Sequence, residues 1–168
     1  MFTRIFYQGL AQMLGGTPTS PTVKTYLGQI KTTPYGLENY VKNFSSAVGQ
    51  FCTSPKTDAY IKNCVAFGDG NVPVTMDDYN LSGDHIRTYT ALLNRAMNDD
   101  FDTSTVTYTI TNTGTQAFTI REVGVYVVSS SSDYTALAYR EVLPDPLTIE
   151  PNGVGQVTLT FNVNIPES

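Results

Sequence analysis

The sequence predicts a mainly β fold, an antiparallel β-sandwich of the jelly-roll or immunoglobulin-like type with a short N-terminal helix. Three observations support this prediction. The 168 residues include 24 Thr and 11 Tyr, which suit half-buried strands. Several segments alternate apolar and polar residues with a period of two, and turn-forming residues separate them. Charged residues make up only 15% of the chain, below the about 25% of a typical soluble domain, so uncharged polar side chains must cover much of the surface.

The first fourteen residues predict an amphipathic helix that Gly15-Gly16 ends. Its apolar stripe consists of Phe2, Ile5, Phe6, Leu10, Met13 and Leu14. Gln8 and Gln12 interrupt the apolar residues, so a signal peptide is not expected. So short a helix is marginal alone in water and must dock, either on its own domain or on a neighbouring subunit. We expect the stripe to pack on another chain, which predicts an N-terminal anchor region over residues 1–60 and a β-sandwich domain over residues 61–168.

Residues 15–84 carry weaker signals. A Gly/Pro/Thr/Ser-rich stretch over 15–36 predicts a loop with one strand near 23–30, and residues 40–51 fit either a helix or a strand. Residues 61–67 predict a strand that enters a glycine-containing turn at 68–71. A long loop follows over residues 71–84, which contain Pro, Asn, Asp and Gly.

The second half of the chain carries the clear strand patterns. Residues 85–97 fit a strand, although 91–97 alone also fit a helix. Strands are predicted near 105–111, 118–128, 134–143 and 157–165. Within the second of these, Gly124 breaks the alternation and indicates a bulge or a close approach of two backbones. The residues expected in one core are Val106, Tyr108, Ile110, Val157, Leu159, Phe161 and Val163.

Candidates for catalysis are few. The single histidine, His85, follows Asp84, but no nucleophile elbow accompanies them. Paired carboxylates of the kind that glycoside hydrolysis requires are available only as unsupported combinations of Asp77, Asp78, Asp99, Asp100, Asp102 and Glu122. We therefore expect no enzymatic activity and no cofactor.

Metal binding is also poorly supported. Asp69, Asn71, Asp77 and Asp78 offer oxygen ligands for calcium, but their spacing does not match an EF-hand, and turn formation explains them more simply. Cys52 and Cys64 with one histidine cannot complete a tetrahedral zinc site on their own. The two cysteines are either buried thiols, the simpler interpretation, or a hairpin disulfide.

Charge is distributed unevenly along the chain. Residues 1–66 hold six basic and two acidic groups, while the whole chain has a net charge of −5. The basic residues are not clustered enough to neutralise several phosphates, so nucleic-acid binding is not expected. No run approaches the about 20 apolar residues of a membrane-spanning helix. Glu122 lies in the middle of a predicted strand, where a buried carboxylate needs a partner, and Arg140 on the next strand is the candidate.

Three blocks of the chain form a joint pattern: FGDGNVPVTMDDYNL (67–81), TYTITNTGTQAFTIREVGVYV (107–127) and YREVLPDPLTIEPNGVGQVTLTF (139–161). In this order they resemble small virion structural proteins of tailed bacteriophages, especially phages of gut bacteria. The resemblance spans about 100 residues and implies a capsid decoration, head fibre or tail component with a β-sandwich fold, assembled in the bacterial cytoplasm and located in the virion. It implies other virion proteins and copies of the chain itself as partners. The alternative function is a carbohydrate-binding or host-adhesion module, for which an exposed aromatic platform would be the distinguishing feature.

Overall fold

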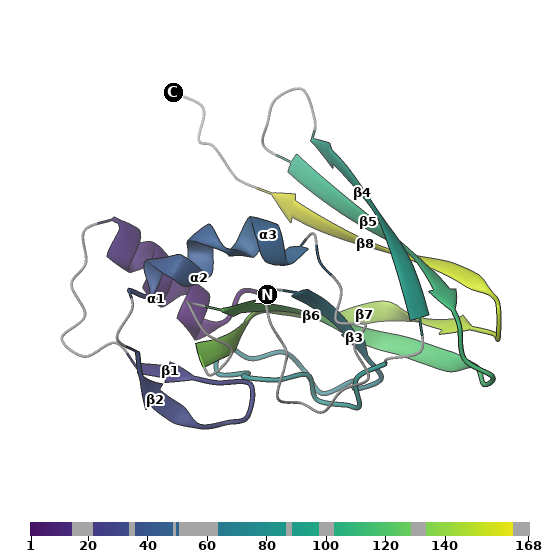
Figure 1. Ribbon diagram of the computed structural model, residues 1–168, viewed down its shortest axis with the longest axis horizontal. Coiled ribbons are helices and arrows are strands. Elements are labelled where there is room, and N and C mark those ends of the chain that lie inside the picture. Colours follow the sequence, from purple (N-terminus) through teal and green to yellow (C-terminus); the bar gives the residue numbers. More distant parts are fainter. Residues whose placement is uncertain are drawn as a thin grey trace. The chain divides into compact units, whose positions relative to one another are not determined.

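The computed structural model of the chain is mainly β, with antiparallel sheets and a short N-terminal helix, which confirms the predicted fold class (Figure 1). It describes residues 1–14, 22–33, 36–48, 50, 64–86, 89–97, 103–128 and 134–162. The helices are α1 (Arg4–Met13), α2 (Glu38–Lys42) and α3 (Phe44–Val48). The strands are β1 (Thr22–Lys24), β2 (Ile30–Thr32), β3 (Cys64–Gly68), β4 (Tyr89–Met97), β5 (Thr103–Asn112), β6 (Phe118–Val128), β7 (Thr135–Ile149) and β8 (Val154–Asn162).

The chain forms two compact units, which differ from the two predicted domains. The first unit comprises Met1–Arg87 and Thr119–Leu147, and the second comprises Thr88–Phe118 and Thr148–Ser168. The boundary predicted at residue 60 therefore falls inside the first unit. The N-terminal region belongs with strands from the middle of the chain because its backbone and side chains pack on them.

The first unit contains a three-stranded sheet in the order β3-β6-β7. Helices α1–α3 lie on one side of this sheet and the β1–β2 hairpin on the other (Figure 1). Val123, Val125 and Val127 of the central strand are all fully buried. Since the intervening Tyr126 is buried as well, β6 is apolar on both faces, which is why its sequence alternates poorly.

Gly124 is not at a bulge, and what approaches it is two leucine side chains instead of the second backbone that the sequence suggested. It pairs with Ala66 in an uninterrupted β3–β6 register. A β-carbon at this position would lie 2.8 Å from a methyl of Leu81 and 2.9 Å from a methyl of Leu137. A side chain at this position would therefore displace the Leu81 and Leu137 methyls, so glycine allows both leucines to pack directly on the β6 backbone.

The weakly predicted segments become short, defined elements. The single strand expected near 23–30 is instead two strands, because Gly28, with φ of 76°, reverses the chain between β1 and β2. The backbone N–H of Gly28 donates to the carbonyl of Thr25 at 2.8 Å and closes this turn. The stretch that fitted either a helix or a strand forms α2 and α3, and buried Tyr40 in α2 donates from its hydroxyl to the carbonyl of Tyr134 at 2.6 Å.

The N-terminus is integrated into the first unit. Phe2 forms an antiparallel bridge with Tyr139 of β7, and the Thr3 N–H donates to the carbonyl of Ala138 at 2.9 Å. Within α1, Ile5 is buried, and a β-carbon on Gly9 would lie 2.4 Å from the carbonyl oxygen of Leu37. The start of the chain is therefore held on its own unit, by backbone contacts with β7 and by close packing against Leu37.

The second unit contains the sheet β4-β5-β8, in which both pairings are antiparallel. On one face Val106 lies opposite Leu159 and Tyr108 opposite Val157, and all four are at most 4% exposed. Ile110 is also buried, whereas Phe161 is half-buried. Val163 lies outside the described residues, so the predicted core is confirmed for five of its seven members.

Cys64 follows the second of the two interpretations given above. It is disulfide-bonded and 5% exposed. Cys52, the other cysteine of the sequence, lies outside the described residues. The interpretation of both cysteines as thiols is therefore wrong for Cys64.

Candidate functional site

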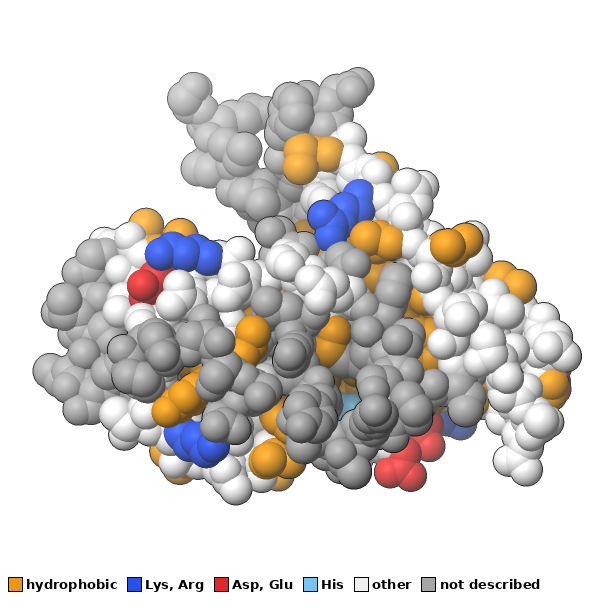
Figure 2. Space-filling model, viewed as in Figure 1, with side chains coloured by type: hydrophobic (Ala, Val, Ile, Leu, Met, Phe, Trp, Pro, Cys, Tyr) orange, Lys and Arg blue, Asp and Glu red, His pale blue; other side chains and the backbone are white. Residues whose placement is uncertain are grey.

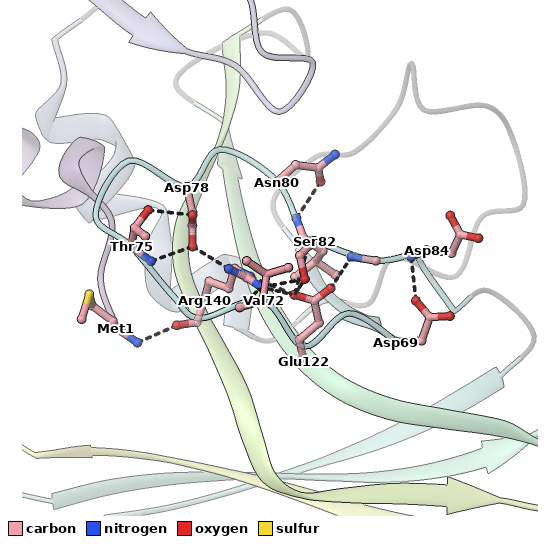
Figure 3. A network of polar contacts seen from close by, with 12 residues as sticks. Met1, Asp69, Val72, Thr75, Asp78, Asn80, Ser82, Asp84, Glu122 and Arg140 are labelled. Carbon is pink, nitrogen blue, oxygen red and sulfur yellow. Dashed lines mark hydrogen bonds and ion pairs between the residues drawn. The ribbon is translucent and has the colours of Figure 1, made fainter.

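A cluster of buried charges in the first unit holds the long loop between β3 and residue 85 (Figure 3). Glu122 on β6 and Arg140 on β7 are 0% and 1% exposed. The Arg140 Nε donates to Glu122 Oε2 at 2.8 Å, which confirms the partner expected from the sequence. The pair therefore joins neighbouring strands below the loop.

Arg140 uses its remaining donors on the loop itself. Its Nη1 donates to Asp78 Oδ2 at 2.6 Å, and its Nη2 donates to the carbonyl of Val72 and to Ser82 Oγ, both at 2.8 Å. One guanidinium thus binds three separate points between residues 72 and 82. The planar fork of arginine suits this task better than the point charge of lysine.

Glu122 binds the same loop through its carboxylate. It accepts hydrogen bonds from the backbone N–H groups of Ser82 and Gly83, at 3.1 and 2.8 Å. Burial alone would raise the pKa of Glu122, but the Gly83 and Ser82 amides and Arg140 outweigh it and lower the pKa below its ordinary value. The carboxylate is therefore ionised at neutral pH and has no proton to donate.

The loop contributes internal contacts of its own. Asp78 accepts from the backbone N–H and the hydroxyl of Thr75, at 3.0 and 2.8 Å, and Asp69 accepts from the Asp84 N–H at 2.8 Å. The Thr75–Asp78 contacts are the turn-forming role that the sequence favoured over calcium binding, whereas the Asp69 contact joins residues 15 positions apart across the loop. Among the described residues, no group of three or more His, Cys, Asp or Glu side chains is placed to hold a metal ion.

The structure places the His85 ring beside Asn80 and Tyr126. Its Nε2 lies 3.1 Å from Asn80 Oδ1 and 3.3 Å from the Tyr126 hydroxyl. The Tyr126 hydroxyl in turn donates to Asn80 Oδ1 and accepts from the Leu81 N–H at 3.0 Å. This group fastens the end of the loop to β6. No local sequence pattern indicates this group, because Asn80 and Tyr126 are 46 positions apart.

Of the other carboxylate candidates, only Asp77 lies among the described residues. Asp77 forms an exposed ion pair with Arg4 of α1 at 2.7 Å. Asp99, Asp100 and Asp102 lie outside the described residues, as does any contact they make. The buried cluster of Glu122, Arg140 and Asp78 thus acts chemically as a support for the loop.

The predicted anchor stripe divides in two. Phe2 and Phe6 are half-buried, with their rings stacked 4.1 Å apart and both near Phe44, and Ile5 is buried in the first unit. Ile5 therefore docks on its own chain. The remaining apolar side chains of the helix form an exposed face, which we call the α1 face: Tyr7 (46% exposed), Leu10 (38%), Met13 (48%) and Leu14 (81%).

A polar hollow of about 330 Å³ opens beside the same loop. Its lining includes Tyr79, Asn80, Asp77 and Asp78. Tyr79 is 38% exposed, and the Lys24 ammonium lies 4.0 Å from the centre of its ring. Charged side chains are otherwise sparse on the face drawn in Figure 2, where most of the described surface is uncharged.

Because the comparisons with known proteins find no match, a function can be argued only from the structural features described above. No protein family, no curated protein and no solved structure matches the chain. Within the described residues, none of the helices has both the length and the apolar character needed to cross a bilayer.

Proposed function

We propose that this protein is a non-enzymatic structural component of a tailed-phage virion, which assembles through contacts with its own copies and with neighbouring capsid or tail proteins. The resemblance of the three sequence blocks supports this proposal. The first block is the loop that Arg140 and Glu122 hold, and the other two supply most of β5–β8. The blocks thus correspond to the parts that give the chain its shape.

The α1 face is the observation that carries the proposal. Four apolar side chains are exposed on one short helix, and Leu14 is 81% exposed. Burying an apolar side chain of this size is worth about 1.5–3 kcal/mol, so a face of this kind favours a protein interface. The helix itself is held firmly by the Met1–Thr3 contacts with β7, so it presents the face on a rigid support.

Composition of purified particles tests this proposal. Mass spectrometry of gradient-purified virions from the encoding source should find the protein at a fixed stoichiometry, and electron microscopy should locate it on the particle. Its absence from such particles would contradict the proposal.

The α1 face is tested by a double substitution, Leu10→Ser with Leu14→Ser. We expect the variant to keep its thermal transition, since both residues are exposed, and to lose incorporation into particles. Gln8→Ser, an exposed change on the same helix, is the matched control and should be incorporated normally. Normal incorporation of the double variant would exclude this face as the assembly surface.

The hollow beside Tyr79 favours the alternative function, a carbohydrate-binding or host-adhesion module. An exposed aromatic ring next to amide and carboxylate groups suits the apolar and hydroxyl faces of a sugar. A glycan array probed with the intact protein would show binding that Tyr79→Ala abolishes. Tyr7→Ala, which removes an exposed tyrosine from α1, should leave such binding unchanged. Absence of binding to any glycan would exclude the alternative.

A further inference from the structure

Strand β4 is paired on one side only. Nine consecutive residue pairs join it to β5 without a bulge, and it stands at the end of the order β4-β5-β8. Within the part of the chain that the structure describes, no strand pairs with its outer side. A regular edge of this length presents a row of backbone donors and acceptors to any strand that approaches.

Within β4 itself and among the described residues, the usual protections of an edge strand are missing. Proteins block such edges with proline, bulges, several charges or a covering segment. The sequence of β4, YTALLNRAM, has no proline, no glycine and a single charge at Arg95. It also places Leu92, 76% exposed, at its middle and Met97, 58% exposed, at its end.

The first unit shows what a protected sheet looks like in the same chain. The outer edge of β7 is covered by Met1–Thr3, and Pro144 and Pro146 occupy its far end. On the outer edge of β3, the Phe67 carbonyl accepts a hydrogen bond from the Ile86 N–H at 2.8 Å. The Val65 N–H of the same strand donates to the carbonyl of Gln50. Against this background, the open edge of β4 is a distinct feature of the second unit.

We propose that β4 is a self-association edge, at which two copies of this chain pair their β4 strands antiparallel about a twofold axis near Leu92. Two three-stranded sheets then become one six-stranded sheet. This proposal rests on the proposed assembly function and adds a contact between copies of the chain. It uses a surface other than the α1 face.

The pairing is chemically self-consistent. With Leu92 on the axis, Leu92 meets its own copy and Thr90 meets Asn94 of the second copy. Arg95 then faces Tyr89, so the only charge of the strand does not oppose itself. Burial of Leu92 against Leu92 removes the most exposed apolar side chain of the second unit from water.

The other open edge, β8, is a poorer choice. Its middle exposes Gln156, Thr158 and Thr160, which are polar. A β4–β8 contact that kept the sheet faces aligned would be parallel, because both strands run antiparallel to β5. Parallel pairing is slightly less stable per residue, and that contact would give an open-ended chain of copies instead of a closed dimer.

Sedimentation of the full chain over a range of concentrations tests the proposal, with Leu92→Lys as the disrupting variant. The matched control is Gln156→Lys, since Leu92, Thr109 and Gln156 lie opposite one another in one row across the sheet. We expect a concentration-dependent dimer for the native chain and for the control, and at least about tenfold weaker dimerisation for Leu92→Lys.

Every other pattern contradicts the proposal. A native chain that stays monomeric, a dimer that survives Leu92→Lys, a dimer broken by Gln156→Lys, or open-ended oligomers each exclude the β4 twofold contact. Covalent dimerisation of Leu92→Cys, but not of Gln156→Cys, under mild oxidation gives an independent check. If the native chain is a monomer in solution but is still incorporated into particles, the β4 contact is excluded while the proposed virion role stands. Failure of this proposal and failure of the proposed function are therefore distinguishable.

Discussion

The sheet β3-β6-β7 and the sheet β4-β5-β8 have three strands each, but the chain stabilises them differently. In the first sheet, segments distant in sequence cover both outer edges, and a buried ion pair links β6 to β7. In the second, apolar side chains on one face carry the stability, and the described residues leave the strand edges open. The first unit is therefore held by contacts within the chain, whereas no described strand pairs with the outer sides of β4 and β8 in the second.

Removal of the buried guanidinium should break the first sheet most severely. Arg140→Met leaves Glu122 buried and ionised without its cation, and loss of one partner from a buried pair costs about 3–5 kcal/mol. Urea unfolding monitored by circular dichroism measures the effect. Arg4→Met, which breaks only the exposed pair with Asp77, is the control and should unfold like the native chain. Equal effects of the two changes would mean that the cluster does not hold the loop.

Leu159→Ala should have the largest effect on the second sheet. Leu159 is 1% exposed, and truncation of a buried leucine costs about 2–5 kcal/mol in the free energy of unfolding. Thr160→Ala, on the exposed face next to it, should cost within about 0.5 kcal/mol. Similar costs at the two positions would show that the strand register is wrong, since a one-residue slip exchanges the faces.

Gly9→Ala sharpens the assignment of α1 to the first unit. Alanine is normally preferred over glycine inside a helix by about 0.5–1 kcal/mol. Here its β-carbon would lie 2.4 Å from the Leu37 carbonyl oxygen, and such overpacking costs about 1–3 kcal/mol, so the variant should be less stable. Gln8→Ala, at an exposed position of the same helix, should not lower the thermal transition. A more stable Gly9→Ala protein would mean that α1 does not dock on α2.

Acid should weaken the first unit through Glu122 and Asp78, whose pKa values are lowered below the ordinary 4.5 and 3.8. Because the folded pKa values are the depressed ones, their stabilisation is complete above about pH 4.5 and is lost as the pH falls through the folded pKa values. Glu122→Gln should therefore show a shallower loss of stability between about pH 5 and 3 than the native chain. A slope identical to that of the native chain would mean that Glu122 does not titrate with unfolding.

The fold class, most of the later strands and the Glu122–Arg140 pair were predictable from the sequence because each has a local signal. The end of β7 was not, since the strand predicted over 134–143 continues through Pro144 and Pro146 to Ile149. Alternation marks β5 and β8, and a carboxylate in the middle of an apolar strand needs a nearby cation. The bounds of β6, 118–128, were also predicted correctly, since turn residues flank an apolar run. Gly124 was recognised because a glycine inside a strand weakens it unless space requires it.

The rest depends on contacts that leave no local signal. The pairing of Met1–Thr3 with β7 joins residues more than 130 positions apart. For this reason the first helix was predicted to be a detachable anchor, whereas three of its supporting contacts are backbone hydrogen bonds, which no side-chain pattern reveals. The Asn80–Tyr126–His85 group was missed for the same reason, and Asp78 was considered as a calcium ligand because its partner Arg140 lies 62 positions away.

Hydrogen exchange of backbone amides, followed by mass spectrometry or NMR on the native chain at low and high concentration, tests the difference between the two sheets most directly. We expect β3 and β7 amides to be protected at both concentrations, because the chain's own segments cover their edges. We expect outer β4 amides around Leu92 to exchange quickly in dilute solution and to become protected as the concentration rises. Equal protection of β4 at every concentration, or loss of protection along β7 in dilute solution, would contradict the account.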